Sequence, residues 1–166
     1  MNEKQYKKMM HPFRMHPEYI SLLNLSNTLL TLSAFILYPV LLGWMAFQMK
    51  KEVFALFFIP AFCFLTMSKM RRLINRPRPY ETFSIVPLIS REGKGESFPS
   101  RHVFSIFLIA TLWFGFLPAV GIVLLFFGVV LAIIRVIAGV HYPSDVCWGA
   151  IFGMACGLLT LYICTL

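Results

Sequence analysis

Long apolar runs separated by short polar links dominate the chain. Residues 20–49, 53–68, 103–134 and 146–166 contain no charged side chain. About 20 apolar residues cross the hydrocarbon core of a bilayer as a helix, so these runs predict membrane-spanning helices. A single helix over residues 103–134 would measure about 48 Å, well beyond a core of about 30 Å. We therefore expect a hairpin there, broken around residues 115–121 with Pro118 at the turn, and about five spans in all.

The polar links predict where the spans end. Residues 50–52 close the first span, and the second begins at residue 53. Its helix is expected to continue through a basic segment until Pro77 and Pro79 stop it, because proline lacks the backbone N–H and clashes with the preceding turn. Residues 80–98 mix charges with glycine and proline and predict a solvent-facing loop.

The first 19 residues mix basic, aromatic and methionine side chains. This pattern suits a helix in the headgroup layer, and it is equally compatible with a frayed tail. No apolar core follows the early lysines, so we do not expect a cleavable signal peptide. Residues 1–19 are interpreted as an interfacial segment and residues 20–166 as one transmembrane domain.

Composition agrees with this picture and narrows the partners. Hydrophobic residues make up 58% of the chain and charged residues 13%, which predicts an all-α, polytopic membrane helical bundle. The net charge is +8, but the basic residues lie beside apolar spans, which favours anionic lipid or phosphate over nucleic acid. The four cysteines form no CxxC pair, so neither a zinc site nor a disulfide framework is expected.

The predicted hairpin brings the ends of spans two and four and the starts of spans three and five to one membrane face. Charged residues near the membrane should therefore meet there and form one polar site. They are Lys69, Arg71, Arg72, Arg76 and Arg78 after span two, Arg101 and His102 before span three, and Arg135, His141 and Asp145 before span five.

Phosphoryl transfer suits such a site. Fixed cations lower its barrier by stabilising charge on the non-bridging oxygens, and Lys69, Arg76 and Arg135 are candidates for this role. The guanidinium groups can bind these oxygens in bidentate fashion, whereas the lysine adds a compact point charge. A phosphate-binding cradle is the resulting expectation.

Two histidines can supply the proton and nucleophile chemistry. Neutral His141 can attack phosphorus, and Asp145, four residues later, is placed to accept a hydrogen bond from its other ring nitrogen. His102 would then protonate the departing oxygen and later activate water against the phosphohistidine.

Three motifs with these residues resemble the signatures of the type 2 phosphatidic acid phosphatase (PAP2) superfamily. They are Lys69, six residues, then Arg76 and Pro77; Pro99, Ser100, one residue, then His102; and Arg135, five residues, His141, three residues, then Asp145. The resemblance implies that His141 is the nucleophile, Asp145 its partner and His102 the general acid. It also implies that Lys69, Arg76, Ser100 and Arg135 bind phosphate without metal or other cofactor, and that residues 20–166 form the catalytic domain.

Two positions depart from the family pattern. Arg101 replaces the glycine of the second motif, and Ile134 replaces the serine that usually begins the third. We predict that Arg101 adds a phosphate-binding cation suited to a diphosphate headgroup. Ser100 and backbone donors are expected to replace part of what the hydroxyl at position 134 would supply.

The residues outside the motifs have simpler interpretations. Arg71, Arg72 and Arg78 are expected to contact lipid headgroups. A glycine repeat at every fourth position of the last span, Gly149, Gly153 and Gly157, predicts close packing between helices of the same chain.

The resemblance ranks undecaprenyl diphosphate first as substrate, ahead of phosphatidylglycerophosphate and phosphatidic acid, because compact bacterial relatives often recycle lipid carriers. The alternative is a non-catalytic protein that binds or transports lipid phosphates. Halide oxidation by bound vanadate is disfavoured, since the relatives that catalyse it are soluble. A positive-inside count places the site in the cytoplasm, whereas the resemblance places it on the outer face of the cell membrane, the orientation expected here. The sequence is silent on oligomeric state.

Overall fold

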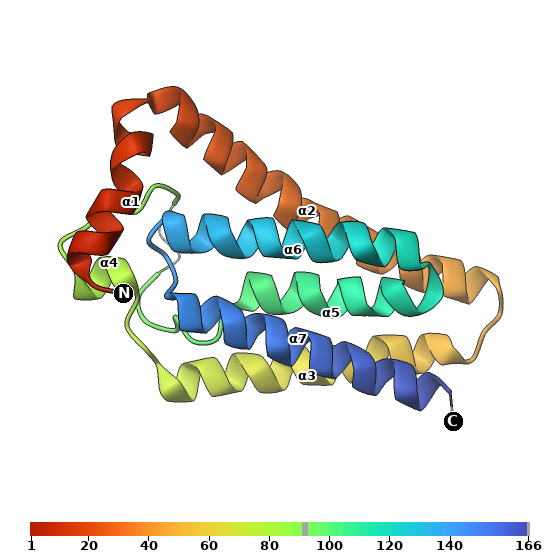
Figure 1. The fold of residues 1–166 in the computed structure, drawn as a ribbon. Helices are drawn as coiled ribbons and strands as arrows, with labels where there is room; N and C mark the ends of the chain where they lie inside the picture. Colours follow the sequence, from red (N-terminus) through yellow and green to blue (C-terminus); the bar gives the residue numbers. More distant parts are fainter. Residues whose placement is uncertain (91–92, 166) are drawn as a thin grey trace.

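The computed structural model describes residues 1–90 and 93–165, and this part of the chain contains helices and no strand (Figure 1). The helices are α1 (Glu3–Met15), α2 (Pro17–Phe47), α3 (Glu52–Ile74), α4 (Pro79–Thr82), α5 (Arg101–Phe116), α6 (Pro118–Ile137) and α7 (Pro143–Cys164). The predicted all-α fold is confirmed.

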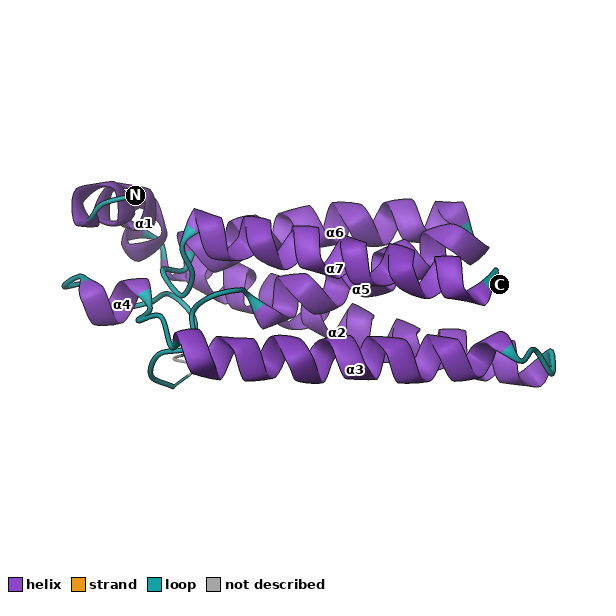
Figure 2. Ribbon diagram, turned by 90° about the horizontal axis from the view of Figure 1, so that it is seen from below, coloured by secondary structure: helices purple, strands orange, loops and turns teal. Residues whose placement is uncertain are grey.

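The long helices form a bundle around α5, as the two ribbon views show (Figures 1 and 2). Every residue of α5 from Phe104 to Trp113 except Ser105 is buried, and the helix packs against α7, α6, α2 and α3. The predicted hairpin is present, since α5 ends at Phe116 and Pro118 opens α6. Proline suits a first helical position because its missing N–H would have no partner there.

The protein is a membrane protein. Within the described residues, four helices, α2, α3, α6 and α7, are long and apolar enough to cross a bilayer. The outer faces of α2 and α3 expose large apolar side chains, among them Phe35, Phe58 and Phe62. The fifth predicted span, α5, has only 16 residues and is shorter than a usual span. Its burial inside the bundle allows this length, because neighbouring helices rather than lipid surround it.

Small residues let α7 approach α5 closely, as the glycine repeat predicted. A Cβ atom added at Gly149 would lie 2.7 Å from the Ser100 carbonyl oxygen, and one at Gly153 would lie 2.4 Å from the Phe104 carbonyl oxygen. Such distances leave no room for a side chain. The resulting contact fixes the start of α5, where the second motif lies, against the start of α7, where the third motif ends.

Two expectations about the polar links need correction. The helix after span two ends at Ile74, before the prolines, because Asn75 adopts a left-handed conformation with φ of 41°. Asparagine tolerates this conformation, and the residue before Pro77 is biased away from helix. The loop over residues 80–98 is not wholly solvent-facing, because Leu88 and Ile89 are buried in the cluster that α1 covers. Its Arg91 and Glu92 lie outside the described residues.

The N-terminal segment forms a helix that lies at the same end of the bundle as α4 (Figure 1). The side chains of Asn2 and Gln5 cap the start of this helix reciprocally, and its own residues Tyr6 and Met10 are fully buried. The helix α1 therefore covers the end of the bundle where the three motifs lie. Its position in the headgroup layer and the domain boundary at residue 19 stay predictions.

Candidate functional site

The three motifs are joined by backbone hydrogen bonds at the end of the bundle near α1 and α4. The Ser97 amide donates to the Arg76 carbonyl oxygen at 2.9 Å, which links the loop before the second motif to the first motif. The Ser100 amide donates to the Asp145 carbonyl oxygen at 2.9 Å, which links the second motif to the third. The Arg71 guanidinium donates to the Pro99 carbonyl oxygen and adds a side-chain link. The predicted convergence at one end of the bundle is therefore present.

His141 is completely buried between a cation and a carboxylate. Nη2 of Arg135 lies 3.4 Å from its Nε2, while Asp145 Oδ2 lies 3.6 Å and Ser97 Oγ 3.5 Å from its Nδ1. A guanidinium can only donate, so its contact with Nε2 requires an unprotonated Nε2 and places the ring proton on Nδ1. Arg135 is held in turn by Asn27, whose Oδ1 lies 3.4 Å from Nη1. Nε2 of His141 thus faces the positive charge of Arg135, and its predicted role as the nucleophile stays a prediction.

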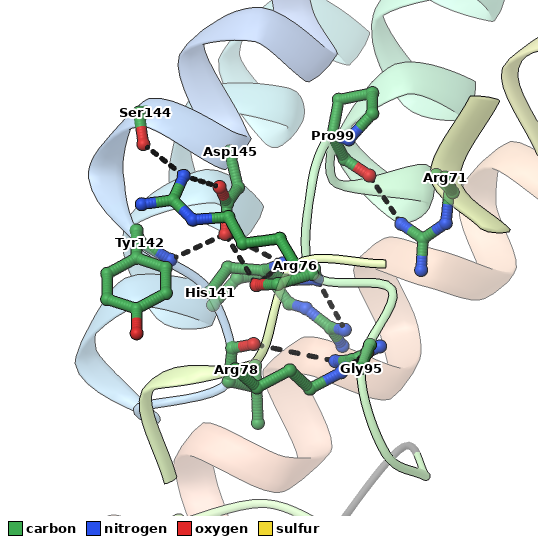
Figure 3. A network of polar contacts seen from close by, with 12 residues as sticks. Arg71, Arg76, Arg78, Gly95, Pro99, His141, Tyr142, Ser144 and Asp145 are labelled. Carbon is green, nitrogen blue, oxygen red and sulfur yellow. Dashed lines mark hydrogen bonds and ion pairs between the residues drawn. The ribbon is translucent and has the colours of Figure 1, made fainter. Parts of the chain in front are cut away.

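Asp145 is the centre of the polar network drawn in Figure 3. Its carboxylate accepts hydrogen bonds from Ser97 Oγ at 2.6 Å, from the Tyr142 amide at 2.9 Å and from Arg76 Nη1 at 2.7 Å. The direct distance of 3.6 Å to His141 exceeds a normal hydrogen bond. Ser97, which no sequence motif pointed to, contacts both groups and completes the predicted pair.

Arg76 has two kinds of contact in the site. Besides Asp145, its Nη1 donates to Ser144 Oγ at 2.9 Å, and its guanidinium lies 4.2 Å from the centroid of the Tyr142 ring. The side chain is 36% exposed, so part of the guanidinium remains accessible. Its predicted role as a phosphate ligand is compatible with this accessible edge and stays a prediction.

Arg71 and Arg78 are not the headgroup contacts that we expected. Both are buried, at 4% and 2% exposure. Nε of Arg78 donates to the Gly95 carbonyl oxygen at 3.0 Å (Figure 3). Its Nη1 donates to the Val140 carbonyl oxygen at 3.4 Å. The two arginines hold the loop before the second motif in place because buried carbonyl oxygens need donors. The sequence carried a signal for this pair, since Arg71, six residues, then Arg78 and Pro79 repeats the spacing of the first motif. Arg72, by contrast, is exposed.

The second motif lines a polar pocket. Half-buried His102 and exposed Arg101 open α5 and face a space of about 560 Å³. Ser100 is fully buried, and its Oγ has no hydrogen-bond partner among the described residues. The hydroxyl is therefore available for a ligand that reaches it, and the predicted role of Ser100 as a phosphate ligand stays a prediction.

Lys69 is the predicted site residue that the structure does not connect to the others. It is exposed on α3 and forms no hydrogen bond or ion pair with any residue in the described part of the chain. Its side chain does not line the polar pocket. Phosphate binding by Lys69 stays a prediction.

Tyr6 contributes to the site from outside the motifs. Its hydroxyl donates to the His141 carbonyl oxygen at 3.0 Å, and its ring packs edge-on against Tyr142. The residue is fully buried, and this burial raises the pKa of the hydroxyl, so it stays a protonated donor at neutral pH. A lone tyrosine 135 residues before the histidine carries no sequence signal for this contact.

Apolar space adjoins the polar pocket on the membrane side. Arg101 and His102 also line a narrow cavity of about 150 Å³ that extends towards Leu131. Phe35 and Phe64 line both this cavity and a larger one of about 270 Å³ between α2, α3 and α5. Apolar cavities therefore lie next to one another between α2, α3 and α5, and the smaller one reaches His102.

Metal ligands do not gather in the described part of the chain. No group of three or more His, Cys, Asp or Glu side chains there is placed to hold one ion. The metal-independent chemistry implied by the motifs stays a prediction that only an assay can test.

The chain is similar to known proteins in sequence and in structure. The sequence model of the PAP2 superfamily matches residues 52–165, which include all three motifs. A lipid A 1-phosphatase of Rhizobium johnstonii is 34% identical over 113 residues, covering 65% of this chain and 46% of the relative. The chain thus spans about half the length of that curated relative.

Two further proteins are similar over more of their length. A Bacillus licheniformis protein named bacitracin transport permease protein BcrC is 28% identical over 137 residues, covering 79% of this chain and 68% of the relative. The crystal structure of Aquifex aeolicus LpxE superposes with a TM-score of 0.74 at 27% identity, covering 97% of this chain and 94% of that one.

Proposed function

The chain belongs to the PAP2 superfamily, and from that premise we propose that it is a membrane phosphatase that hydrolyses the phosphate or diphosphate of a lipid. The observation that carries the proposal is the environment of His141. A buried neutral imidazole with Arg135 at Nε2 and the Asp145–Ser97 pair at Nδ1 is arranged for attack on an anionic phosphorus centre.

The proposed reaction proceeds in two steps, phosphorylation of His141 and hydrolysis of the phosphohistidine. In the first, Nε2 of His141 attacks phosphorus, the bond to the leaving oxygen breaks, and His102 donates a proton to that oxygen. Asp145 stabilises the imidazolium character that develops, and Arg135 stabilises charge on the non-bridging oxygens. In the second, His102 takes a proton from water, the water oxygen attacks phosphorus, and inorganic phosphate leaves the histidine. Neither step needs a metal ion.

The apolar cavities beside His102 support a lipid substrate over a small soluble ester. A hydrocarbon chain entering from the bilayer between α2 and α3 would find apolar walls up to the general acid. A relative named lipid A 1-phosphatase agrees with a lipid-linked phosphate. Within this class we place undecaprenyl diphosphate first, then phosphatidylglycerophosphate and phosphatidic acid.

The proposal also covers the location of the protein and the side of the membrane on which its active site lies. We infer a multi-pass protein of the cell membrane with its active site on the outer face. The support is the family resemblance, which places the site on the outer face. Leaving out cations retained for chemistry lowers the positive-inside count on the side of the site but does not reverse it, because the basic residues of the N-terminal segment still outnumber Lys50 and Lys51.

Phosphate release tests the proposed function. Detergent-solubilised protein is mixed, in the presence of chelator, with phosphatidic acid, phosphatidylglycerophosphate and prenyl diphosphates. Release from at least one lipid is expected, with a loss of about a thousandfold or more in His141→Ala. The matched control His16→Ala removes an exposed histidine on the N-terminal side of α2 and should keep full activity. No release from any lipid would favour the non-catalytic binding or transport protein, and loss of activity in chelator would reject the metal-independent mechanism.

A further inference from the structure

Arg76 contacts the carboxylate that faces His141. Its Nη1 lies 2.7 Å from Oδ1 of Asp145, while Ser97 Oγ and the Tyr142 amide donate to Oδ2 at 2.6 Å and 2.9 Å. The two oxygens of the carboxylate are therefore held by different donors. Because Asp145 is completely buried, its ion pair with Arg76 is less screened by water than a surface pair.

Further contacts hold Arg76 itself in place. Its Nη1 also donates to Ser144 Oγ at 2.9 Å, and its guanidinium lies 4.2 Å from the centroid of the Tyr142 ring (Figure 3). Its carbonyl oxygen accepts the Ser97 amide at 2.9 Å. Ser97 and Tyr142, the other two residues that donate to Asp145, are thus both in contact with Arg76. Arg76 is therefore part of the structure that fixes the carboxylate.

Arg76 does not line the polar pocket beside His102. Two pairs of basic residues near the end of α3 have the same spacing, Lys69 with Arg76 and Arg71 with Arg78. Of these described residues, Arg71 and Arg78 line the pocket, whereas Lys69 and Arg76 do not. The pocket therefore has arginines of its own, and the guanidinium of Arg76 is directed to Asp145 instead.

We propose that Arg76 is a positioning residue, which holds the Asp145 carboxylate and balances its charge so that His141 stays neutral, and which does not bind the phosphate. The inference rests on the proposed function and replaces the role that the motif spacing predicts for Arg76. A carboxylate stabilises the protonated form of a neighbouring histidine, and a guanidinium beside that carboxylate weakens this effect. Loss of Arg76 should therefore let His141 keep a second proton up to a higher pH, and a protonated imidazole cannot attack phosphorus.

Other charged or titratable groups surround the pair of His141 and Asp145, and they are unchanged when Arg76 is replaced. They come from several elements: Tyr6 from α1, Arg78 after α3, Arg101 and His102 at the start of α5, Arg135 from α6 and Tyr142 before α7. A change in the pH response of an Arg76 variant therefore reports the loss of the Arg76 charge.

Steady-state kinetics of the full-length protein tests the proposal, with the lipid of the panel above that the unsubstituted protein hydrolyses fastest. Arg76→Gln should lower kcat about tenfold, because a hydrogen bond between charged groups is lost, while KM changes less than about twofold. The acidic limb of the kcat/KM profile should move to higher pH by about half a unit or more. Arg72→Gln removes an exposed arginine without a hydrogen bond or ion pair to any described residue, and both quantities should stay unchanged.

Inhibition by inorganic phosphate separates positioning from phosphate binding. Arg76→Gln should leave the inhibition constant within about twofold, whereas loss of a phosphate ligand would raise it about tenfold or more. Arg76→Lys keeps the charge, so it should return the acidic limb to its original pH while kcat recovers only in part. If Arg76→Gln does not fold, the inhibition constant of Arg76→Lys decides between the two roles, since a lysine cannot replace a bidentate phosphate contact.

Two results overturn the positioning role of Arg76 and leave the phosphatase intact. One is a large rise in the phosphate inhibition constant of either variant, and the other is an acidic limb that does not move in a folded Arg76→Gln protein. Absence of phosphate release from every lipid by the unsubstituted protein contradicts the proposed function itself, and this inference with it.

Discussion

Ser97 supplies a hydroxyl at the point where Asp145 and His141 are too far apart for a direct hydrogen bond. Its Oγ lies 2.6 Å from the carboxylate and 3.5 Å from Nδ1 of the imidazole. If its proton points to the carboxylate, its lone pair can accept the Nδ1 proton. Ser97 is thus placed to act as a positioning residue that holds the tautomer with the ring proton on Nδ1.

Replacing Ser97 tests this role. Ser97→Ala should lower kcat about tenfold with little change in KM, because a hydrogen bond to a charged group is lost without affecting substrate contacts. Ser144→Ala removes a hydroxyl that Arg76 contacts at the exposed edge of the site, where water can replace it, and should cost less than about threefold. Steady-state kinetics on one lipid substrate decides between them. Equal losses in the two variants would contradict a positioning role for Ser97.

Tyr6 holds the backbone at the other side of the same histidine. Tyr6→Phe removes only the hydroxyl that donates to the His141 carbonyl oxygen, so we expect kcat to fall about fivefold while the fold is kept. Tyr19→Phe deletes the same atom from an exposed tyrosine and serves as the matched control. A fall in thermal stability without a fall in kcat would show that Tyr6 only supports packing.

At the scale of elements, the contact between α5 and α7 sets the geometry of the site. The Ser100 amide reaches the Asp145 carbonyl oxygen only because Gly149 lets the two helices approach. The second motif therefore depends on the glycine repeat for its place beside the third.

Helix packing can be tested with a pair of glycines. Gly153→Ala should destabilise the protein by about 1–3 kcal/mol, because the added Cβ would lie 2.4 Å from the backbone oxygen of Phe104. Gly43→Ala on α2 meets nothing within 4 Å and should be neutral or stabilise by up to about 1 kcal/mol. Thermal unfolding in detergent measures both. A neutral Gly153→Ala would mean that α5 and α7 are not in close contact.

At the scale of the whole molecule, the two ends of the bundle have different characters. The site, α1 and α4 lie at one end, and the link between α2 and α3 lies at the other (Figure 1). Orientation in the membrane thus decides which compartment the substrate headgroup and the released phosphate occupy.

Reporter fusions can determine that orientation. With the active site on the outer face, a reporter at the N-terminus should be active outside the cell and one at Lys50 inside. Both ends of α2 are then assigned in one experiment, because the helix runs from the site to the opposite end. The reverse pattern would place the active site in the cytoplasm and agree with the positive-inside count.

The sequence predicted the parts of the molecule that depend on local pattern. The apolar run over residues 103–134 required a hairpin, and the hairpin brought the motifs to one end. The contacts that it could not reveal connect distant residues, such as Tyr6 with His141 or Arg78 with Val140. These contacts depend on how helices and loops pack in space, and no residue spacing encodes them. The family prediction is confirmed, since the PAP2 sequence model covers all three motifs.

The central claim is that His141 becomes phosphorylated during turnover. The most direct measurement mixes the protein with lipid substrate labelled in its terminal phosphate, stops the reaction in alkali within the first turnover, and locates the label on the chain. We predict label on His141 that survives alkali, is released by acid and is absent from the His141→Ala protein. Phosphate release without any label on the protein, or label on another residue, would contradict the account.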